Sequence, residues 1–501
     1  MMPALPVASI TATTLEWISL LHIFAFALVA VHCLTNRREA TSSLLWMFVA
    51  WGFPIVGPSL FLLFGINRVP AKAWRKRHSD VRFLNERKAR EEEAKPLAYW
   101  RSLRKAVATD PEEPSLHKLN HLMNAIMPEF PLLGQNHIEP LVTGDEAFPR
   151  MLTAIRAASH HIHMQVFILG NDAIGRTFLE ALREKAEQGV TVRLLYDRLG
   201  CTHARWAGLF HRYAKIPNMH IACWTQLDPI KGRFQANLHN HRKILVVDGQ
   251  TAFAGGINLS ANNITTPRAQ PDRDFHFALL GPIVHELQYS FLCDWYFMTD
   301  DAPGALLCEA HFPKTVQAGT ALMRMANGAP IPDLDDLTDA FFATVTTAQK
   351  QLLAVTPYFV PPPEILSAFR SAALRGVDVR LIVPQKNNHH YAGLAGRALY
   401  EDLLKAGVRV FERPPPFIHA KAMLVDDSLA LVGTANLDVR SLRLNYETNL
   451  AVFDAPFVAK MNQLLQAELA CCHEIKLPAW NRRSTARKLA ENFCSLLTPV
   501  L

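Results

Sequence analysis

The sequence lacks any paired cysteine motif and carries little charge of either sign. Its eight cysteines form no CxxC pair, so neither a zinc knuckle nor a disulfide framework is indicated, and a reducing compartment is expected for the main domain. Charged residues make up only 19% of the chain, and the formal net charge of +7 is small. This argues against a dedicated nucleic-acid-binding protein. The 50% of hydrophobic residues exclude disordered, collagen-like and coiled-coil chains.

Long hydrophobic runs are present, and two of them lie near the N-terminus. Residues 15–34 contain four polar residues, and residues 44–65 contain no charge. As a helix, each run would span about 30 Å, the thickness of a bilayer core. We therefore predict a transmembrane hairpin in residues 1–68, in preference to a signal peptide or to two buried core helices. Pro54 and Pro58 are expected to kink the second helix.

Basic residues around these runs predict their orientation. No Lys or Arg precedes residue 15, whereas five follow the second run closely: Arg68, Lys72, Arg75, Lys76 and Arg77. The positive-inside rule then places the N-terminus and the main domain in the cytoplasm. Arg37 and Arg38, between the two runs, oppose this orientation.

Residues 69–130 are charged and favour helix, so we predict a helical linker there. The most polar run, residues 86–95, is typical of a solvated helix face, and no chemistry is assigned to it.

The chain from residue 131 to residue 470 reads as a duplication. A buried strand, a helix and a Val-rich strand after a glycine follow one another twice, with the second strands reading "GVTVRLLYD" from Gly189 and "GVDVRLIVP" from Gly376. This order predicts a duplicated α/β fold with two pseudo-symmetric mixed-sheet halves, residues 131–305 and 306–470. An internal two-fold repeat usually places a shared site between its halves.

Residues 471–501 form the last predicted segment, an amphipathic tail. Apolar residues recur in it at helical spacing behind a basic head: Ala486, Leu489, Ala490, Phe493, Leu496, Leu497 and Val500. Such a helix lies in a membrane interface or packs on the protein's own core, and the sequence leaves both open.

The same motif occurs once in each half of the duplication. Its members are His241, Lys243, Asp248 and Asn258 in the first half, and His419, Lys421, Asp426, Thr434 and Asn436 in the second. The two copies are offset by 178 residues at every shared position. One such motif is a weak signal, but two in register are a strong one.

The residue types of the motif suit a phosphate diester. His and Lys two residues apart on an extended strand share a face, so the two copies would bring two imidazoles and two ammonium groups together. One His can attack phosphorus and the other can protonate the leaving alcohol, while lysines, Asn amides and Thr434 hold the oxygens. The lysines take the place of a metal, so neither a metal nor a cofactor is expected. Asp248 and Asp426 end apolar strands and are interpreted as anchors of the turn.

A carboxylate follows each motif. Asp274 lies downstream of the first copy, and Glu447 lies downstream of the second. A carboxylate on the far ring nitrogen would fix the tautomer of a catalytic histidine and stabilise its charged form.

These paired motifs resemble the phospholipase D superfamily, and together with the N-terminal hydrophobic runs they resemble the bacterial cardiolipin synthases within it. The resemblance rests on Asn240–Ser260, Thr356–Pro361 and His419–Glu447 and extends over most of the chain. It implies a multi-pass protein of the bacterial inner membrane that needs no metal. The implied reaction transfers a phosphatidyl group from one phosphatidylglycerol to another through a phosphohistidine and releases glycerol.

The resemblance also implies roles for the histidines. His241 would be the nucleophile, oriented by Asp274, and His419 the acid and base, oriented by Glu447. The sequence departs from the family pattern at His239, Gln165 and Pro414–Pro416, so the acceptor alcohol stays open. A hydrolase releasing phosphatidic acid would use the same residues, whereas a nuclease would gain nothing from a membrane hairpin.

Overall fold

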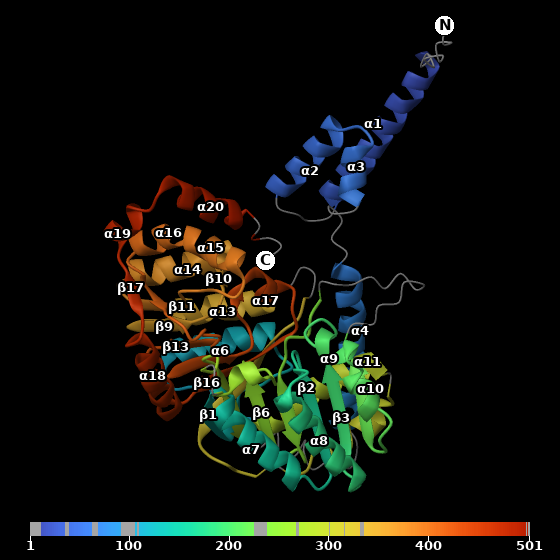
Figure 1. Cartoon of the computed structure of the whole chain (residues 1–501), viewed down its shortest axis with the longest axis vertical. Coiled ribbons are helices and arrows are strands. Elements are labelled where there is room, and N and C mark those ends of the chain that lie inside the picture. Colours follow the sequence, from blue (N-terminus) through green and yellow to red (C-terminus); the bar gives the residue numbers. More distant parts are fainter. Residues whose placement is uncertain are drawn as a thin grey trace. The chain divides into compact units, whose positions relative to one another are not determined.

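The computed structural model of the chain describes residues 12–35, 40–62, 69–91, 106–107, 110–224, 238–266, 270–299, 301–314, 316–330, 335–496 and 498 (Figure 1). Arg37, Arg38 and Arg68, which bear on the predicted orientation, lie outside the described residues, as do Leu497 and Val500 of the predicted tail. The chain divides into two compact units, Met1–Ala71 and Lys72–Leu501.

The first unit contains three helices, α1 (Ala12–Thr35), α2 (Ala40–Gly52) and α3 (Val56–Leu60). The second hydrophobic run, residues 44–65, is divided between α2 and α3, and the break lies beside Pro54, one of the two prolines expected to kink it. Pro54 cannot donate a backbone hydrogen bond and disfavours the helical conformation of the residue before it, and Ile55 adopts a φ of 65°. Among the described residues, no helix combines the length and the apolar character needed to cross a membrane. The transmembrane hairpin predicted for residues 1–68 is not confirmed and stays a prediction.

The segment predicted as a linker belongs to the second unit. Helix α4 (Val69–Glu91) buries Lys76 and Arg87. The Arg87 guanidinium lies 3.0 Å from Glu286, and the Lys76 ammonium lies 3.1 Å from Asp294. Arg87 belongs to the run predicted as a solvated face, so that prediction is wrong there. A charged run can still be buried when each charge meets a partner of opposite sign.

Helix α6 (Pro114–Ile126) joins the core of the second half of the duplication. Arg324, fully buried on strand β8, donates to the carbonyl oxygens of Met123, Met127 and Phe130 at 3.0, 3.2 and 2.8 Å. The carbonyls of Met123 and Met127 also accept backbone N–H groups, so Arg324 adds a second bond to each and ties the end of α6 to the sheet.

The first half runs, in chain order, through β1 (Leu133–Val142), α7 (Thr143–Ala157), β2 (His161–Val166), α8 (Ala173–Glu187), β3 (Thr191–Tyr196), α9 (Thr202–Trp206), α10 (Leu209–Tyr213), β4 (Met219–Cys223), β5 (Ile244–Val247), β6 (Thr251–Gly255), a 3₁₀ turn (Ala261–Asn263), β7 (Phe275–Leu280), α11 (Ile283–Thr299) and α12 (Pro303–Leu306).

The second half continues with β8 (Ala321–Gly328), α13 (Asp336–Thr347), β9 (Gln351–Val355), β10 (Phe359–Val360), α14 (Pro363–Leu374), β11 (Asp378–Pro384), α15 (His390–Ala398), α16 (Tyr400–Lys405), β12 (Arg409–Arg413), β13 (Ala422–Val425), β14 (Leu429–Gly433), β15 (Leu437–Asp438), α17 (Val439–Arg443), β16 (Glu447–Phe453), α18 (Ala455–Leu469), β17 (His473–Ile475), α19 (Leu477–Asn481) and α20 (Thr485–Ser495).

One sheet runs through both halves. Within the described residues its order is β17-β12-β11-β9-β13-β14-β16-β8-β1-β7-β6-β5-β2-β3-β4. Strands β8 and β1 pair antiparallel at the centre, and the strands on either side correspond one to one, apart from β17. Parallel and antiparallel pairs occur on both sides. The predicted duplicated α/β fold with mixed sheets is confirmed, with the two sheets fused into one.

Each half has its own hydrophobic core. The first is built from β2, β3, α7 and α8, and the second from β9, β11, α13 and α14. Strands β5 and β13 are buried along their whole length, which explains their unbroken apolar sequences. The loops before these two strands carry the histidine motifs.

Candidate active site

Two isolated β-bridges connect the histidine motif of each half to the other half. Asn240 forms a parallel bridge with Tyr446, and Arg273 forms one with Ile418. The N–H of His241 donates to the carbonyl of Tyr446 at 2.9 Å, and the N–H of His419 donates to the carbonyl of Arg273 at 2.7 Å. Each histidine is thus fixed beside the residue that precedes the carboxylate of the opposite half.

The histidine–carboxylate pairs are therefore crossed. His241 Nδ1 lies 2.9 Å from Glu447 Oε2, and His419 Nδ1 lies 2.7 Å from Asp274 Oδ2. Both predicted carboxylates meet a histidine, but the predicted pairing within one half is wrong. The reason is the pairing in the two bridges. Each bridge places the residue before a carboxylate, Arg273 or Tyr446, beside the residue before the histidine of the other half.

The two carboxylates have different surroundings. Glu447 accepts a short hydrogen bond from the Thr434 hydroxyl and one from Asn445 Nδ2 at 3.2 Å. Thr434, predicted to support the substrate phosphate, instead holds this carboxylate. Gly256 takes the corresponding place in the first half, and a Cβ there would lie 2.3 Å from Asp274 Oδ1. The shorter acid thus fits because its partner position has no side chain.

Both motif lysines are buried beside the histidines. Lys243 donates to the carbonyl of His241 at 2.8 Å, and Lys421 Nζ lies 3.7 Å from Asp274 Oδ2. Burial lowers the pKa of Lys421 to about 8, opposed by Asp274. Burial also lowers the pKa of Lys243, opposed by Glu447. Two cations held at low dielectric are strong ligands for an anion.

The histidines and their carboxylates are shifted in pKa as well. Burial and the Lys421 charge lower the pKa of His419 to about 4, and burial with Lys243 lowers that of His241. Although burial opposes it, Lys421 and the bond from His419 hold the pKa of Asp274 below its usual value. Burial raises the pKa of Glu447 in spite of Lys243. The two pairs therefore differ: Asp274 is held ionised, and Glu447 is drawn toward its neutral form.

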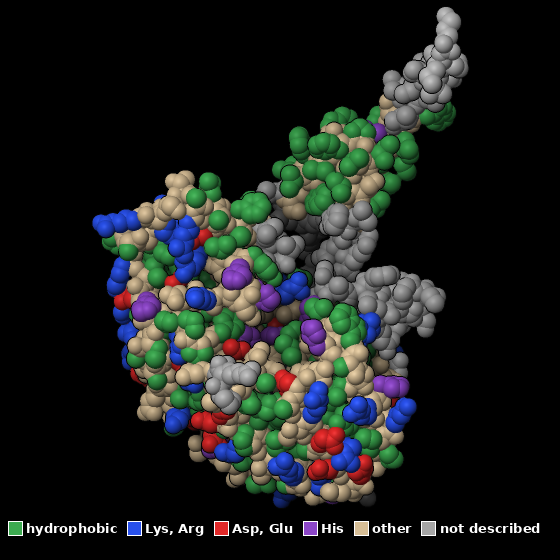
Figure 2. Space-filling model, in the orientation of Figure 1, with side chains coloured by type: hydrophobic (Ala, Val, Ile, Leu, Met, Phe, Trp, Pro, Cys, Tyr) green, Lys and Arg blue, Asp and Glu red, His purple; other side chains and the backbone are tan. Residues whose placement is uncertain are grey.

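A cavity of about 660 Å³ opens above the two histidines. Side chains from both halves line it, including His241, His419, Asn258 and Asn436. Figure 2 shows this face hollowed, with histidines gathered around the hollow. The structure thus brings together both His residues, both Lys residues, both Asn residues and both carboxylates. The volume of the cavity exceeds what one phosphate group needs and suits a lipid head group.

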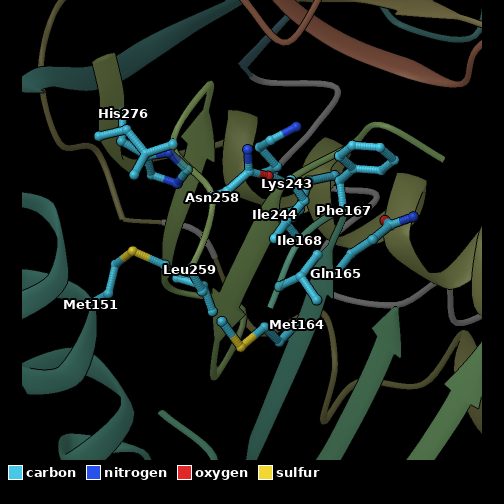
Figure 3. A pocket seen from close by; sticks show the side chains of 12 residues that line it. Met151, Met164, Gln165, Phe167, Ile168, Lys243, Ile244, Asn258, Leu259 and His276 are labelled. Atoms are coloured by element: carbon cyan, nitrogen blue, oxygen red, sulfur yellow. The ribbon is translucent and has the colours of Figure 1, made fainter. Parts of the chain in front are cut away.

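Apolar and polar side chains pack together next to His241. Figure 3 shows Lys243 and Asn258 close to each other beside Phe167, around a small cavity lined also by His276. The rings of Phe167 and His241 pack edge to face, with their centroids 4.7 Å apart. This contact restricts rotation of the imidazole, so its Nδ1 stays on the carboxylate.

Asp248 and Asp426 lie apart from the residues that line this cavity. Asp248 accepts the backbone N–H groups of residues 159–161 at 2.7, 2.8 and 2.8 Å. Asp426 accepts those of residues 349–351, two of them at 2.7 and 2.9 Å. Both adopt a positive φ, of 53° and 50°. Their geometry is that of turn anchors, which tie each motif strand to the strand beside it.

One functional residue was missed by sequence reasoning. Asp294 is fully buried and accepts from Gln165, Asn240 and Arg242 at 2.8, 2.7 and 2.9 Å. It fixes the residues on both sides of His241. The signal was a carboxylate within the apolar run Phe291–Trp295, since a buried charge needs partners.

Comparison with known proteins agrees with this arrangement. The family "Cardiolipin synthase, PLD-like domain" matches residues 151–271 and 341–469, and the family "Phospholipase_D-nuclease N-terminal" matches residues 24–65. The Major cardiolipin synthase ClsA of Bacillus subtilis is 31% identical over 97% of this chain and 98% of its own length. The Cardiolipin synthase of Geobacillus kaustophilus is 32% identical over 93% of this chain and 90% of its own length.

The chain belongs to the cardiolipin synthase family of the phospholipase D superfamily. Among solved structures, phosphatidylserine synthase of Haemophilus influenzae matches with a TM-score of 0.59 and 16% identity, over 77% of this chain and 100% of that one. At that identity the likeness shows the fold alone. Membership in this family confirms the sequence-based identification.

Proposed function

We propose that the protein is a phosphatidyltransferase that makes cardiolipin and glycerol from two molecules of phosphatidylglycerol. The observation that carries this is the pair of crossed His–carboxylate contacts under one cavity, with two buried lysines beside them. Two histidines of opposite function are what a double displacement at phosphorus requires. The cardiolipin synthase relatives support phosphatidylglycerol as both donor and acceptor.

The first step forms a phosphatidyl-histidine. Nε2 of His241 attacks phosphorus, the bond from phosphorus to the glycerol oxygen breaks, and His419 gives a proton to that oxygen. Lys243 and Lys421 balance the charge on the phosphate oxygens. The anionic phosphate also raises the pKa of His419, since an opposite charge nearby favours the protonated ring. The acid thus becomes protonated when the substrate binds.

The second step releases cardiolipin. A head-group hydroxyl of the second phosphatidylglycerol loses its proton to His419 and attacks phosphorus. The bond from phosphorus to His241 breaks, which restores both imidazoles. If water took the place of this hydroxyl, the product would be phosphatidic acid.

The exposure of the two rings supports this assignment. The His419 side chain is 15% exposed, against 9% for His241, and His419 lies near the Tyr358 and Phe417 rings of the wide cavity. The acid and base must reach both the departing and the incoming alcohol, whereas the nucleophile meets only phosphorus.

The test is product analysis with the purified full chain and labelled phosphatidylglycerol. Cardiolipin and glycerol are expected, and excess glycerol should drive cardiolipin back, because the reaction exchanges one phosphodiester for another. Phosphatidic acid as the main product, with no reversal, would establish a hydrolase instead. Mass spectrometry of the quenched His419→Asn variant should find the phosphatidyl adduct on His241, and an adduct on His419 in the His241→Asn variant would reverse the assignment.

We also propose that the first unit attaches the enzyme to the bacterial inner membrane. Large apolar side chains cover its described surface, among them Trp17, Phe24 and Phe48 at 72%, 62% and 69% exposure. An apolar surface of this extent needs a covering partner. The cytoplasmic position of the catalytic unit stays a prediction from the basic residues that follow the first unit.

A further inference from the structure

Helix α20 faces the protein with its polar side. Its apolar residues Leu489, Phe493 and Leu496 are 66%, 66% and 76% exposed, whereas Glu491 is fully buried. At about 100° per residue, Glu491 lies on the opposite side of the helix from Leu489 and Phe493. This is the reverse of an ordinary surface helix, whose apolar side covers the core.

Charged contacts fix this orientation. Glu491 Oε2 lies 3.3 Å from Arg483 Nε, and Glu491 Oε1 lies 3.2 Å from Arg487 Nε. The Arg483 guanidinium also lies over the Trp480 ring, 3.7 Å from its centre. The Trp480 ring beneath Arg483 is buried, and α20 packs against α15 with Glu491 on its buried side, so the apolar side of α20 faces outward.

Helix α20 packs against a helix that helps to line the active-site cavity. Helix α20 packs against α15, and Tyr391 of α15 lines that cavity. Leu199 of the first half lines the same cavity, and Leu199 and Trp206 are 60% and 74% exposed. Figure 2 shows hydrophobic side chains on both sides of the hollow.

We propose that this face, defined by Leu489, Phe493 and Leu496 on one side and by Leu199 and Trp206 on the other, docks on the surface of an anionic phospholipid bilayer. Residues 481–496 contain four basic residues and one acidic residue, and that acid is the buried Glu491. Arg483 and Arg487 pair with Glu491, which leaves Arg482 and Lys488 beside the exposed apolar stripe. Cations beside such a stripe match anionic head groups over acyl chains. The proposal rests on the proposed function in one respect: a two-chain lipid must enter the cavity head first while its chains stay in the bilayer.

Cross-linking identifies what covers this face. In the full chain in phosphatidylglycerol nanodiscs, position 493 is replaced by the photoreactive residue p-benzoylphenylalanine, with the same replacement at Leu374 as a matched control. Leu374 is 70% exposed and lies before the N-terminal end of β11, whereas Asn388 and His389, which line the cavity, follow its C-terminal end. Position 493 is expected to cross-link to phospholipid and position 374 is not. A link from position 493 to a second chain or to the chain's own first unit, or no link, would overturn the proposal.

Kinetics separates this proposal from the proposed function. The variant with Leu489→Asp and Phe493→Asp should lose about tenfold in activity on phosphatidylglycerol bilayers, because two apolar contacts with lipid are replaced by charges of like sign to the head groups. On monomeric short-chain dihexanoyl phosphatidylglycerol its activity should stay within about twofold, and Leu374→Asp should change neither. Equal losses on both substrates, or no loss on bilayers, would contradict docking. Failure of the unaltered chain to make cardiolipin from either substrate would refute the proposed function instead.

Discussion

Replacing the two carboxylates one at a time tests the crossed pairing. In Asp274→Asn, the 2.7 Å contact with His419 loses its charge, while the backbone N–H of Phe275 keeps its acceptor. A charge-assisted hydrogen bond contributes about 3 kcal/mol, which corresponds to a loss of about 150-fold in kcat. An inverted tautomer of His419 would extend the loss to about 10⁴-fold. Thermal unfolding of the variant serves as the control for folding.

The pH profile gives the more specific readout. Asp274 raises the pKa of His419 through its hydrogen bond and its charge. Its loss therefore lowers that pKa, so that His419 loses its proton at a lower pH. The alkaline limb of kcat should move to lower pH, by about one unit or more. Glu447→Gln should leave this limb in place, because Glu447 contacts the other histidine.

The outcome can be interpreted whichever histidine is the nucleophile. With crossed pairs, the carboxylate whose loss moves the alkaline limb comes from the same half as the histidine that carries the adduct. With pairs inside one half, it would come from the opposite half. Finding the limb-shifting carboxylate and the adduct in opposite halves would refute the crossed pairing.

The remaining predictions concern packing, pH and metal. Gly256→Ala should lower kcat as Asp274→Asn does, because the added Cβ meets the Asp274 carboxylate at 2.3 Å; unaltered kinetics would contradict this. Below about pH 6.5 the thermal midpoint should fall, because burial lowers the folded-state pKa of His163 and brings that of His311 to about 4, so stability present above the unfolded pKa is lost as pH falls; His311→Gln should flatten the decline. Asp248→Asn should cost about 1 to 3 kcal/mol in the free energy of unfolding, measured by denaturant titration, with kcat per folded molecule unchanged. Activity should survive EDTA, because lysines supply the positive charge at the phosphate; a collapse reversed only by a divalent ion would contradict this.

The sequence predicted the catalytic set better than its connections. The constant offset of 178 residues between the motifs was enough to predict two halves with one shared site. Every shared motif position has the same offset, so the two copies can be aligned in only one way. The sequence could not predict that each carboxylate contacts the histidine of the other half. These contacts depend on the bridges from Asn240 to Tyr446 and from Arg273 to Ile418, which join positions about 200 and 145 residues apart.

The interpretation of residues 86–95 as a solvated helix face fails at Arg87 for a related reason. Charge density in residues 86–95 carries no information about partners, and Arg87 meets Glu286 from a helix 199 residues away. The second hydrophobic run is divided by local features: Pro54 and Ile55, with its positive φ, lie between α2 and α3. The predicted tail was also more structured than expected, since β17 pairs antiparallel with β12 and extends the sheet.

The differences between the two halves explain how a duplicated site can divide two roles. A symmetric dimer of one half would give both histidines the same partner and the same pKa. Here Lys421 lowers the pKa of Asp274, which lies beside Gly256, a residue without a side chain. Burial raises the pKa of Glu447, which lies beside Thr434. An ionised partner stabilises a histidine that must carry a proton, and a partner drawn toward its neutral form favours a histidine that must stay uncharged to attack. The different surroundings of the two carboxylates support the proposed assignment of proton transfer to His419 and attack to His241.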